Sequence, residues 1–276
     1  MNYRHSFHAG NFADVVKHAV LALVLEHLKR KETPFFVLDT HAGTGLYDLA
    51  ASEAERTGEW RGGIGRVIEA PPPELEAYLA VVRDLNPEGG LRWYPGSPAL
   101  AARLTRPQDR LAFVELHPED HATLRRNFAR DRRVGVHHGD GYGALKALLP
   151  PAERRGLVLI DPPYESADEI EQLRRGLAEA LRRWRSGVFL LWYPIKDPHA
   201  AERFHADLAM LGPPPTLVAE ISLGGKSGGR LAATGLAIVN PPWQLDVALI
   251  ALLPPLAEIL APGEGDSRID WLVREG

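Results

Sequence analysis

The motif Asp161-Pro162-Pro163-Tyr164 is the part of this sequence that is most specific for one chemistry. It follows an apolar run at 157–160, which is typical of a buried strand. An aromatic amine such as adenine N6 is a poor nucleophile, because its lone pair is delocalised into the ring. A carboxylate and a carbonyl beside a proline can accept its two N–H bonds and stabilise the positive charge that develops on alkylation. The prolines stiffen the loop, and the tyrosine offers a face for an extruded base. The motif therefore predicts catalytic roles for Asp161, Pro162 and Tyr164.

A second motif of similar type, Asn240-Pro241-Pro242-Trp243, also follows an apolar run. It lies late in the chain, beyond the strands that are expected to form the core of the sheet. We interpret it as the end of a strand and not as a second catalytic loop.

Three further strand ends carry residues that are suited to a nucleoside cofactor. In an open α/β sheet, ligands bind outside the carboxyl ends of the strands. Gly43 lies in the turn 39–45, where glycine lets the backbone approach a ligand closely, although the three-glycine dinucleotide spacing is absent. Glu115 can hold both ribose hydroxyls; it follows roughly 70 residues later instead of about 20, which an insertion explains. Asp140 can accept a hydrogen bond from an adenine amine, and Gly141 leaves room for the ring.

The composition is that of an ordinary globular protein, with 276 residues, 45% hydrophobic and 25% charged. The sequence contains no cysteine, which excludes disulfides and cysteine-ligated metals. The start resembles no signal peptide and no apolar run spans a bilayer, so a cytoplasmic protein is expected. The net charge of −4 is not that of a nucleic-acid binder, but basic residues gather at 29–31, 125–133 and 174–185. Such clusters are more typical of solvated helix faces than of phosphate tracks.

The predicted elements alternate between strand and helix. Strands are expected at 35–38, 111–114, 134–137, 157–160 and 188–191, and helices at 13–30, 119–128, 142–149 and 168–185. This alternation predicts an α/β fold with a mostly parallel, doubly wound sheet. Segments 216–222 and 231–239 predict an antiparallel hairpin at one edge. Residues 47–95 contain a helical pattern at 74–85 and no evident strand, so they are expected to form a small helical insertion in a core of residues 1–46 and 96–276.

The sequence resembles the RlmJ family of bacterial 23S ribosomal RNA adenine-N6 methyltransferases nearly from end to end. The segments that carry the resemblance are 3–11 with Asp14, Lys17 and His18, then 38–43, 54–59, 94–98, 115–118, 159–164 and 191–194. Departures from the family lie at Phe12, Thr44 and 196–215, and none removes a group that the chemistry needs.

The resemblance implies a Rossmann-like methyltransferase that uses S-adenosyl-L-methionine to methylate N6 of one adenine, position 2030, in 23S ribosomal RNA. It implies a monomer that acts on naked RNA, with Asp161 as the catalytic residue. The cofactor-binding residues expected from the motifs and the resemblance are His18, His41, Gly43, Ser97, Glu115, Asp140, Gly141 and Asp161.

Contacts with RNA are expected from Tyr3, Arg4 and Lys17, and from Lys226 and Arg230 in the glycine-rich loop 224–230. The loop residues can reach phosphates, although a simple hairpin turn is an equal alternative. The N-terminal histidines raise the question of a metal site. Methyl transfer from a sulfonium needs no metal, and no cysteine or carboxylate pattern supports one, so none is expected.

Two other functions are compatible with the motifs. Motifs of Asn or Asp, two prolines and an aromatic residue also serve methyltransferases that act on DNA adenine or on a protein amide. A non-catalytic RNA-binding protein on the same scaffold is the alternative from another class.

Overall fold

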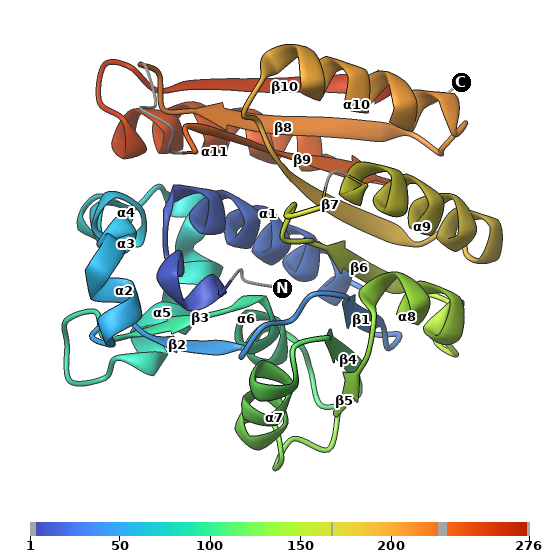
Figure 1. The fold of residues 1–276 in the computed structure, drawn as a ribbon, viewed down its shortest axis with the longest axis horizontal. Helices are drawn as coiled ribbons and strands as arrows, with labels where there is room; N and C mark the ends of the chain where they lie inside the picture. Colours follow the sequence, from blue (N-terminus) through green and yellow to red (C-terminus); the bar gives the residue numbers. More distant parts are fainter. Residues whose placement is uncertain (1–3, 167, 226–230, 275–276) are drawn as a thin grey trace.

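The computed structural model describes residues 4–166, 168–225 and 231–274. The parallel strands are β1 (Phe36–Asp39), β4 (Arg110–Glu115), β5 (Val134–His138), β6 (Gly156–Ile160) and β7 (Val188–Pro194). The antiparallel strands are β8 (Thr216–Ser222), β9 (Ala233–Val239) and β10 (Asp266–Val273). Within the described residues they form one eight-stranded sheet in the order β10-β8-β9-β7-β6-β1-β4-β5 (Figure 1).

This sheet confirms the predicted α/β class and the mostly parallel arrangement. The predicted hairpin also forms, as β8 and β9. The outermost strand on that side is β10, which pairs with β8 and was not predicted. Its side chains are exposed or only half-buried, so its sequence lacks the apolar run that marks the central strands.

Strand register brings three strand ends to one edge of the sheet. Asp39, the last residue of β1, lies opposite Phe113 of β4 and Leu159 of β6. Glu115, the last residue of β4, and Asp161, the residue after β6, therefore lie at the same edge of the sheet. The strands β1 and β6 are buried along their whole length, as expected for parallel strands covered on both faces.

Helices cover both faces of the sheet. One face packs against α1 (Phe12–Lys29), α6 (Ser97–Leu104), α7 (Pro118–Asn127) and α11 (Leu245–Leu260). The other packs against α8 (Gly141–Leu148), α9 (Glu169–Arg183) and α10 (Pro198–Met210). Among the described residues, no helix is long and apolar enough to cross a membrane.

The segment between β1 and β4 contains α2 (Ser52–Thr57), α3 (Glu59–Gly62), α4 (Ile64–Glu69), η2 (Pro73–Leu75) and α5 (Glu76–Leu85). It also contains an antiparallel pair, β2 (Leu46–Asp48) and β3 (Trp93–Pro95). The expectation that this region has no strand is therefore wrong. Strands of three residues are too short to show an alternating pattern in the sequence. We propose residues 47–95 as an insertion, because its helices form a layer beside α1 (Figure 1).

The short helix η1 (His5–Phe7) precedes α1, whose amino end is capped by the Asn11 side chain accepting from the Asp14 amide. The helix α1 lies between the sheet and the insertion and is buried on nearly all sides. Its buried residues include Asp14, Lys17 and His18. Charged groups in such a place need partners that compensate their lost hydration.

Candidate active site

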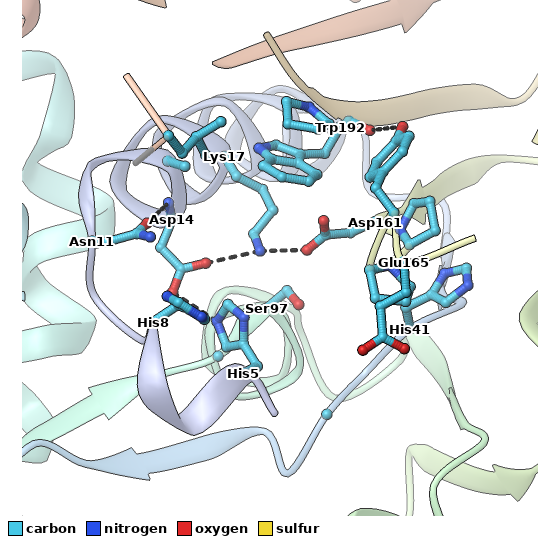
Figure 2. A pocket seen from close by; sticks show the side chains of 18 of the residues that line it. His5, His8, Asn11, Asp14, Lys17, His41, Ser97, Asp161, Glu165 and Trp192 are labelled. Atoms are coloured by element: carbon cyan, nitrogen blue, oxygen red, sulfur yellow. Dashed lines mark hydrogen bonds and ion pairs between the residues drawn. The ribbon is translucent and has the colours of Figure 1, made fainter. Parts of the chain in front are cut away.

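A pocket of about 880 Å³ opens at the carboxyl ends of β1, β4, β6 and β7. The amino end of α1 and the start of the insertion close it on the other side (Figures 1 and 2). Every residue predicted to bind the cofactor lines this pocket, as do Pro162 and Tyr164. The structure therefore brings together side chains from widely separated motifs, and their contact with a cofactor remains a prediction.

Gly43 and Glu115 form a connected pair at the ends of β1 and β4. The Gly43 amide donates to Glu115 Oε2 at 2.8 Å, and the His117 amide donates to Glu115 Oε1 at 2.7 Å. Burial raises the pKa of the Glu115 carboxyl, against these backbone donors. Gly43 has φ +57°, and a Cβ there would lie 2.3 Å from the Tyr47 hydroxyl. The glycine is needed for the turn, and the turn fixes the orientation of the glutamate.

Asp140 and Gly141 begin α8 at the other side of the pocket. Asp140 caps the helix, since its Oδ2 accepts from the Gly143 amide at 2.6 Å. A Cβ at Gly141 would lie 2.3 Å from the Thr40 carbonyl oxygen and 2.9 Å from His41 Cε1. Gly141 was predicted to leave room for the ring of a ligand. The structure shows that it also lets α8 approach the loop after β1.

The catalytic motif follows β6 directly. Tyr164 has φ +51°, a left-handed conformation that is strained for a residue with a side chain. Its hydroxyl donates to the Trp192 carbonyl oxygen at 2.7 Å, and its ring lies 5.7 Å from the Trp192 ring at 60°. Both rings line the pocket. Trp192 lies in a family motif, but its position beside Tyr164 was not evident from the sequence.

Asp161 is held by a lysine from the first helix. Lys17 Nζ lies 2.5 Å from Asp161 Oδ2 and 2.9 Å from Asp14 Oδ1 (Figure 2). The other oxygen of Asp14 accepts from the Gly10 amide at 2.9 Å and lies 2.8 Å from His5 Nε2. These contacts form a chain of alternating charge from the N-terminal segment to the catalytic motif.

For Asp14 and Lys17, the effect of charge pairing on the pKa outweighs the effect of burial. Burial pushes the pKa of Asp14 upwards, but His5 and Lys17 hold it well below its usual value. Burial pushes the pKa of Lys17 downwards, but Asp14 and Asp161 hold it well above its usual value. Both groups are therefore ionised at neutral pH.

The predicted contact of Lys17 with RNA remains a prediction, and this geometry gives the residue another role. The side chain is only 5% exposed and its ammonium is shared between two carboxylates. Asp14 was not predicted as a site residue, although its spacing of three from Lys17 on a helix was a usable signal.

The remaining histidines occupy separate environments. His18 Nδ1 lies 2.8 Å from the Tyr94 hydroxyl, and its buried Nε2 has no hydrogen-bond partner among the described residues. Burial lowers the pKa of His18 to about 3 and that of His41 to about 4, so both rings are neutral at pH 7. His8 instead contacts Glu59 at 3.0 Å.

Of the other residues predicted to contact RNA, the structure describes only Arg4. Arg4 forms ion pairs with Glu119 and Asp120, and Asp120 lines the pocket. Tyr3, Lys226 and Arg230 lie outside the described residues.

The interpretation of Asn240 as a strand end is confirmed. Its side-chain amide donates to the carbonyl oxygens of Arg185 and Gly187, both at 2.7 Å, and it does not line the pocket. An acid after β4 and an Asp-Pro-Pro-Tyr loop after β6 therefore face one pocket, at the edge where open α/β sheets bind ligands. This arrangement is that of a Rossmann-like methyltransferase.

Comparison with known proteins narrows this class to one family. Residues 32–273 match the family model described as "Ribosomal RNA large subunit methyltransferase D, RlmJ". Two proteins named ribosomal RNA large subunit methyltransferase J match over the full length of both chains. The one from Escherichia coli (strain K12) is 46% identical and the one from Haemophilus influenzae (strain ATCC 51907 / DSM 11121 / KW20 / Rd) is 43% identical. The chain belongs to the RlmJ family.

A solved structure agrees with this assignment. The crystal structure of protein LPL1258 from Legionella pneumophila str. Philadelphia 1 is 34% identical to this chain, with a TM-score of 0.89. The alignment covers 95% of this chain and 98% of that one.

Proposed function

We propose that this protein transfers a methyl group from S-adenosyl-L-methionine to N6 of an adenine in 23S ribosomal RNA, position 2030 by family resemblance. The observation that carries the proposal is the position of Asp161, which lines the pocket with its carboxylate held by Lys17 (Figure 2). The names of the full-length relatives support ribosomal RNA as the substrate.

The residues of the pocket fit this cofactor. Eight acidic residues line the pocket, against the two lysines Lys17 and Lys196; the acids are Asp14, Glu59, Glu115, Asp120, Asp140, Asp161, Glu165 and Glu169. An excess of negative charge suits a molecule that carries a sulfonium and an ammonium group. Glu115 would hold the ribose hydroxyls, Asp140 the adenine amine, and the neutral rings of His18 and His41 would pack beside the ligand. When bound, the cofactor supplies an electrophilic methyl group.

The residues of this chain would prepare the adenine amine to accept that group. Asp161 Oδ1 accepts one N–H of the amine, because Oδ2 is occupied by Lys17. The backbone carbonyl of Pro162 accepts the other. Both acceptors favour a tetrahedral nitrogen and stabilise its developing positive charge. As the new N–C bond forms, the bond between the methyl carbon and the sulfonium sulfur breaks, which would leave S-adenosylhomocysteine as the other product. The surplus N6 proton passes to the Asp161 carboxylate and then to solvent.

Tyr164 would position the base. Its hydroxyl is bonded to the carbonyl of Trp192, so the ring has a fixed plane at the pocket wall. A base extruded from RNA can stack on this ring, and such stacking is worth about 1–3 kcal/mol.

The test is incubation of the protein with methyl-labelled S-adenosylmethionine and, separately, 23S ribosomal RNA, duplex DNA and a protein extract. We expect label in RNA, as N6-methyladenine by mass spectrometry, and none in RNA with Asp161→Ala. Label only in DNA or protein would overturn the proposal in favour of those substrates. If Asp161→Ala and the unmodified protein bind RNA equally and neither forms product, the protein is a non-catalytic RNA binder. We also expect the protein to be cytoplasmic and monomeric. Sedimentation of the purified protein would test the oligomeric state.

A further inference from the structure

The structure distinguishes the basic clusters of the sequence from one another. On α9, two of the three acids each pair with two arginines. Glu171 contacts Arg174 and Arg175 at 2.7 and 2.6 Å, and Glu179 contacts Arg182 and Arg183 at 2.8 and 2.6 Å. The arginine charge of this helix face is therefore partly neutralised by its own acids, which leaves a weaker attraction for an external anion.

The cluster at the end of α7 is different. Four of its arginines are exposed and form no ion pair with any described carboxylate; they are Arg125, Arg126, Arg130 and Arg132. The fifth, Arg133, contacts Asp131 at 2.6 Å and donates to the backbone carbonyl of Ala102, so it has a structural role. The acids in the first turn of α7, Glu119 and Asp120, are already paired with Arg4.

A series of side-chain contacts along the edge of the sheet links these four arginines to the pocket. The pocket-lining residue Leu116 is 52% exposed, and its carbonyl oxygen lies 3.0 Å from His138 Nε2 at the end of β5. The His138 ring stacks on His121 of α7 with centroids 4.8 Å apart. Arg125 lies one turn further along α7, on the same side as His121.

The edge itself is open, because no described strand pairs with the outer side of β5. Burial, His138 and Arg125 lower the pKa of His121, so its ring is neutral at pH 7 and the arginines carry the positive charge beside it. From the turn before β5 to the pocket rim the path is about 20 Å long at 3.3 Å per strand residue. A nucleic-acid duplex carries a phosphate on each strand about every 3.4 Å along its axis, so this path spans several.

We propose that the surface formed by His121, Arg125, Arg126, Arg130, Arg132 and His138, here called the α7–β5 basic surface, binds the phosphate backbone of RNA that flanks the target adenosine. The inference rests on the proposed function, because it takes RNA as the substrate. Exposed guanidinium groups that form no ion pair with a described carboxylate bind phosphates with little competition. The surface gives a protein of net charge −4 a local site for a polyanion.

The test compares two double variants that change the net charge equally. Arg125→Ala/Arg132→Ala removes charge from the α7–β5 basic surface. The matched control, Arg175→Ala/Arg182→Ala, removes it from α9, where Arg174 and Arg183 remain to pair the acids. Binding of an in vitro transcript of 23S ribosomal RNA is measured over a series of KCl concentrations, and methyl transfer to the same transcript is measured in parallel.

For the α7–β5 variant we expect affinity to fall about tenfold at low salt, and the slope of log K against log [KCl] to become shallower by about 1.4–1.8. Its KM for RNA should rise with kcat unchanged, and the α9 control should match the unmodified protein. Equal affinities and slopes for the two variants would overturn the inference while leaving the proposed function intact. Binding that depends on this surface, with no label transferred by the unmodified protein, would overturn the proposed function and leave the surface as an RNA site.

Discussion

Replacement of Lys17 by methionine removes a buried positive charge and keeps much of the side-chain volume. Two carboxylates, Asp14 and Asp161, then lose the ammonium that lies within 2.9 Å of each. The side chain of Asp161 is 15% exposed and that of Asp14 only 2%, so hydration can compensate the first more than the second. Most of the penalty therefore falls on Asp14.

Removal of one partner from a buried ion pair costs about 3–5 kcal/mol. We expect Lys17→Met to lower the free energy of unfolding by this amount and the melting temperature by about 10 °C. A domain stable by about 5–15 kcal/mol would still fold. Methyl transfer should be nearly abolished, because Asp161 is no longer held in place.

Urea unfolding at pH 7.5 measures the change, with Asp14→Asn and the double variant Lys17→Met/Asp14→Asn as the comparison. If uncompensated charge is the cause, the double variant recovers most of the stability lost by Lys17→Met and does not recover activity. A double variant as unstable as Lys17→Met would show that packing, and not charge, sets the effect. A loss below about 1 kcal/mol for Lys17→Met would contradict the buried-pair argument altogether.

Three other substitutions test separate parts of the site. Gly141→Ala places a Cβ 2.3 Å from the Thr40 carbonyl, so we expect about 1–3 kcal/mol of destabilisation by urea unfolding and weaker cofactor binding by calorimetry. Tyr164→Phe removes the bond to the Trp192 carbonyl, worth about 1 kcal/mol, and should slow single-turnover methylation several-fold without changing RNA affinity. His18 has a folded pKa of about 3, below its unfolded value, so its contribution to stability is present above pH 6.5 and is lost as pH falls. Between pH 6.5 and 5 this loss is about 1.7 kcal/mol, and His18→Gln should reduce the pH dependence of urea unfolding by that amount, while the share of His41 remains.

The central strands and the strand-end residues were predictable because their physical signals are local. Each buried parallel strand has an apolar run, and polar residues mark the ends of two of them, because Glu115 is the last residue of β4 and Asp161 directly follows β6. The sequence indicated the helix α11 and the strand β10 less clearly. The helix α11 contains Pro254 and Pro255, which in a sequence indicate the end of a helix, and β10 carries few apolar residues in its first half.

The environment of Lys17 was not predictable, because it depends on long-range packing. The spacing between Asp14 and Lys17 is visible in the sequence, but the burial of α1 by the insertion and the approach of Asp161 are not. A lysine near the start of a chain is ordinarily exposed, which made an RNA contact the natural expectation. The basic clusters show the same limit, since only the structure reveals which arginines have acidic partners.

The distance in sequence between the two partners of Lys17 has a consequence for synthesis of the protein. Asp14 is a neighbour on the same helix, whereas Asp161 is separated from Lys17 by 144 positions. At a translation rate of about 5–20 residues per second, the second carboxylate is made roughly 7–30 s after the lysine. During that interval only the local acid is available to neutralise the nascent helix. The Asp161 carboxylate, which is proposed to accept the proton in methyl transfer, is therefore synthesised only after more than half of the polypeptide exists.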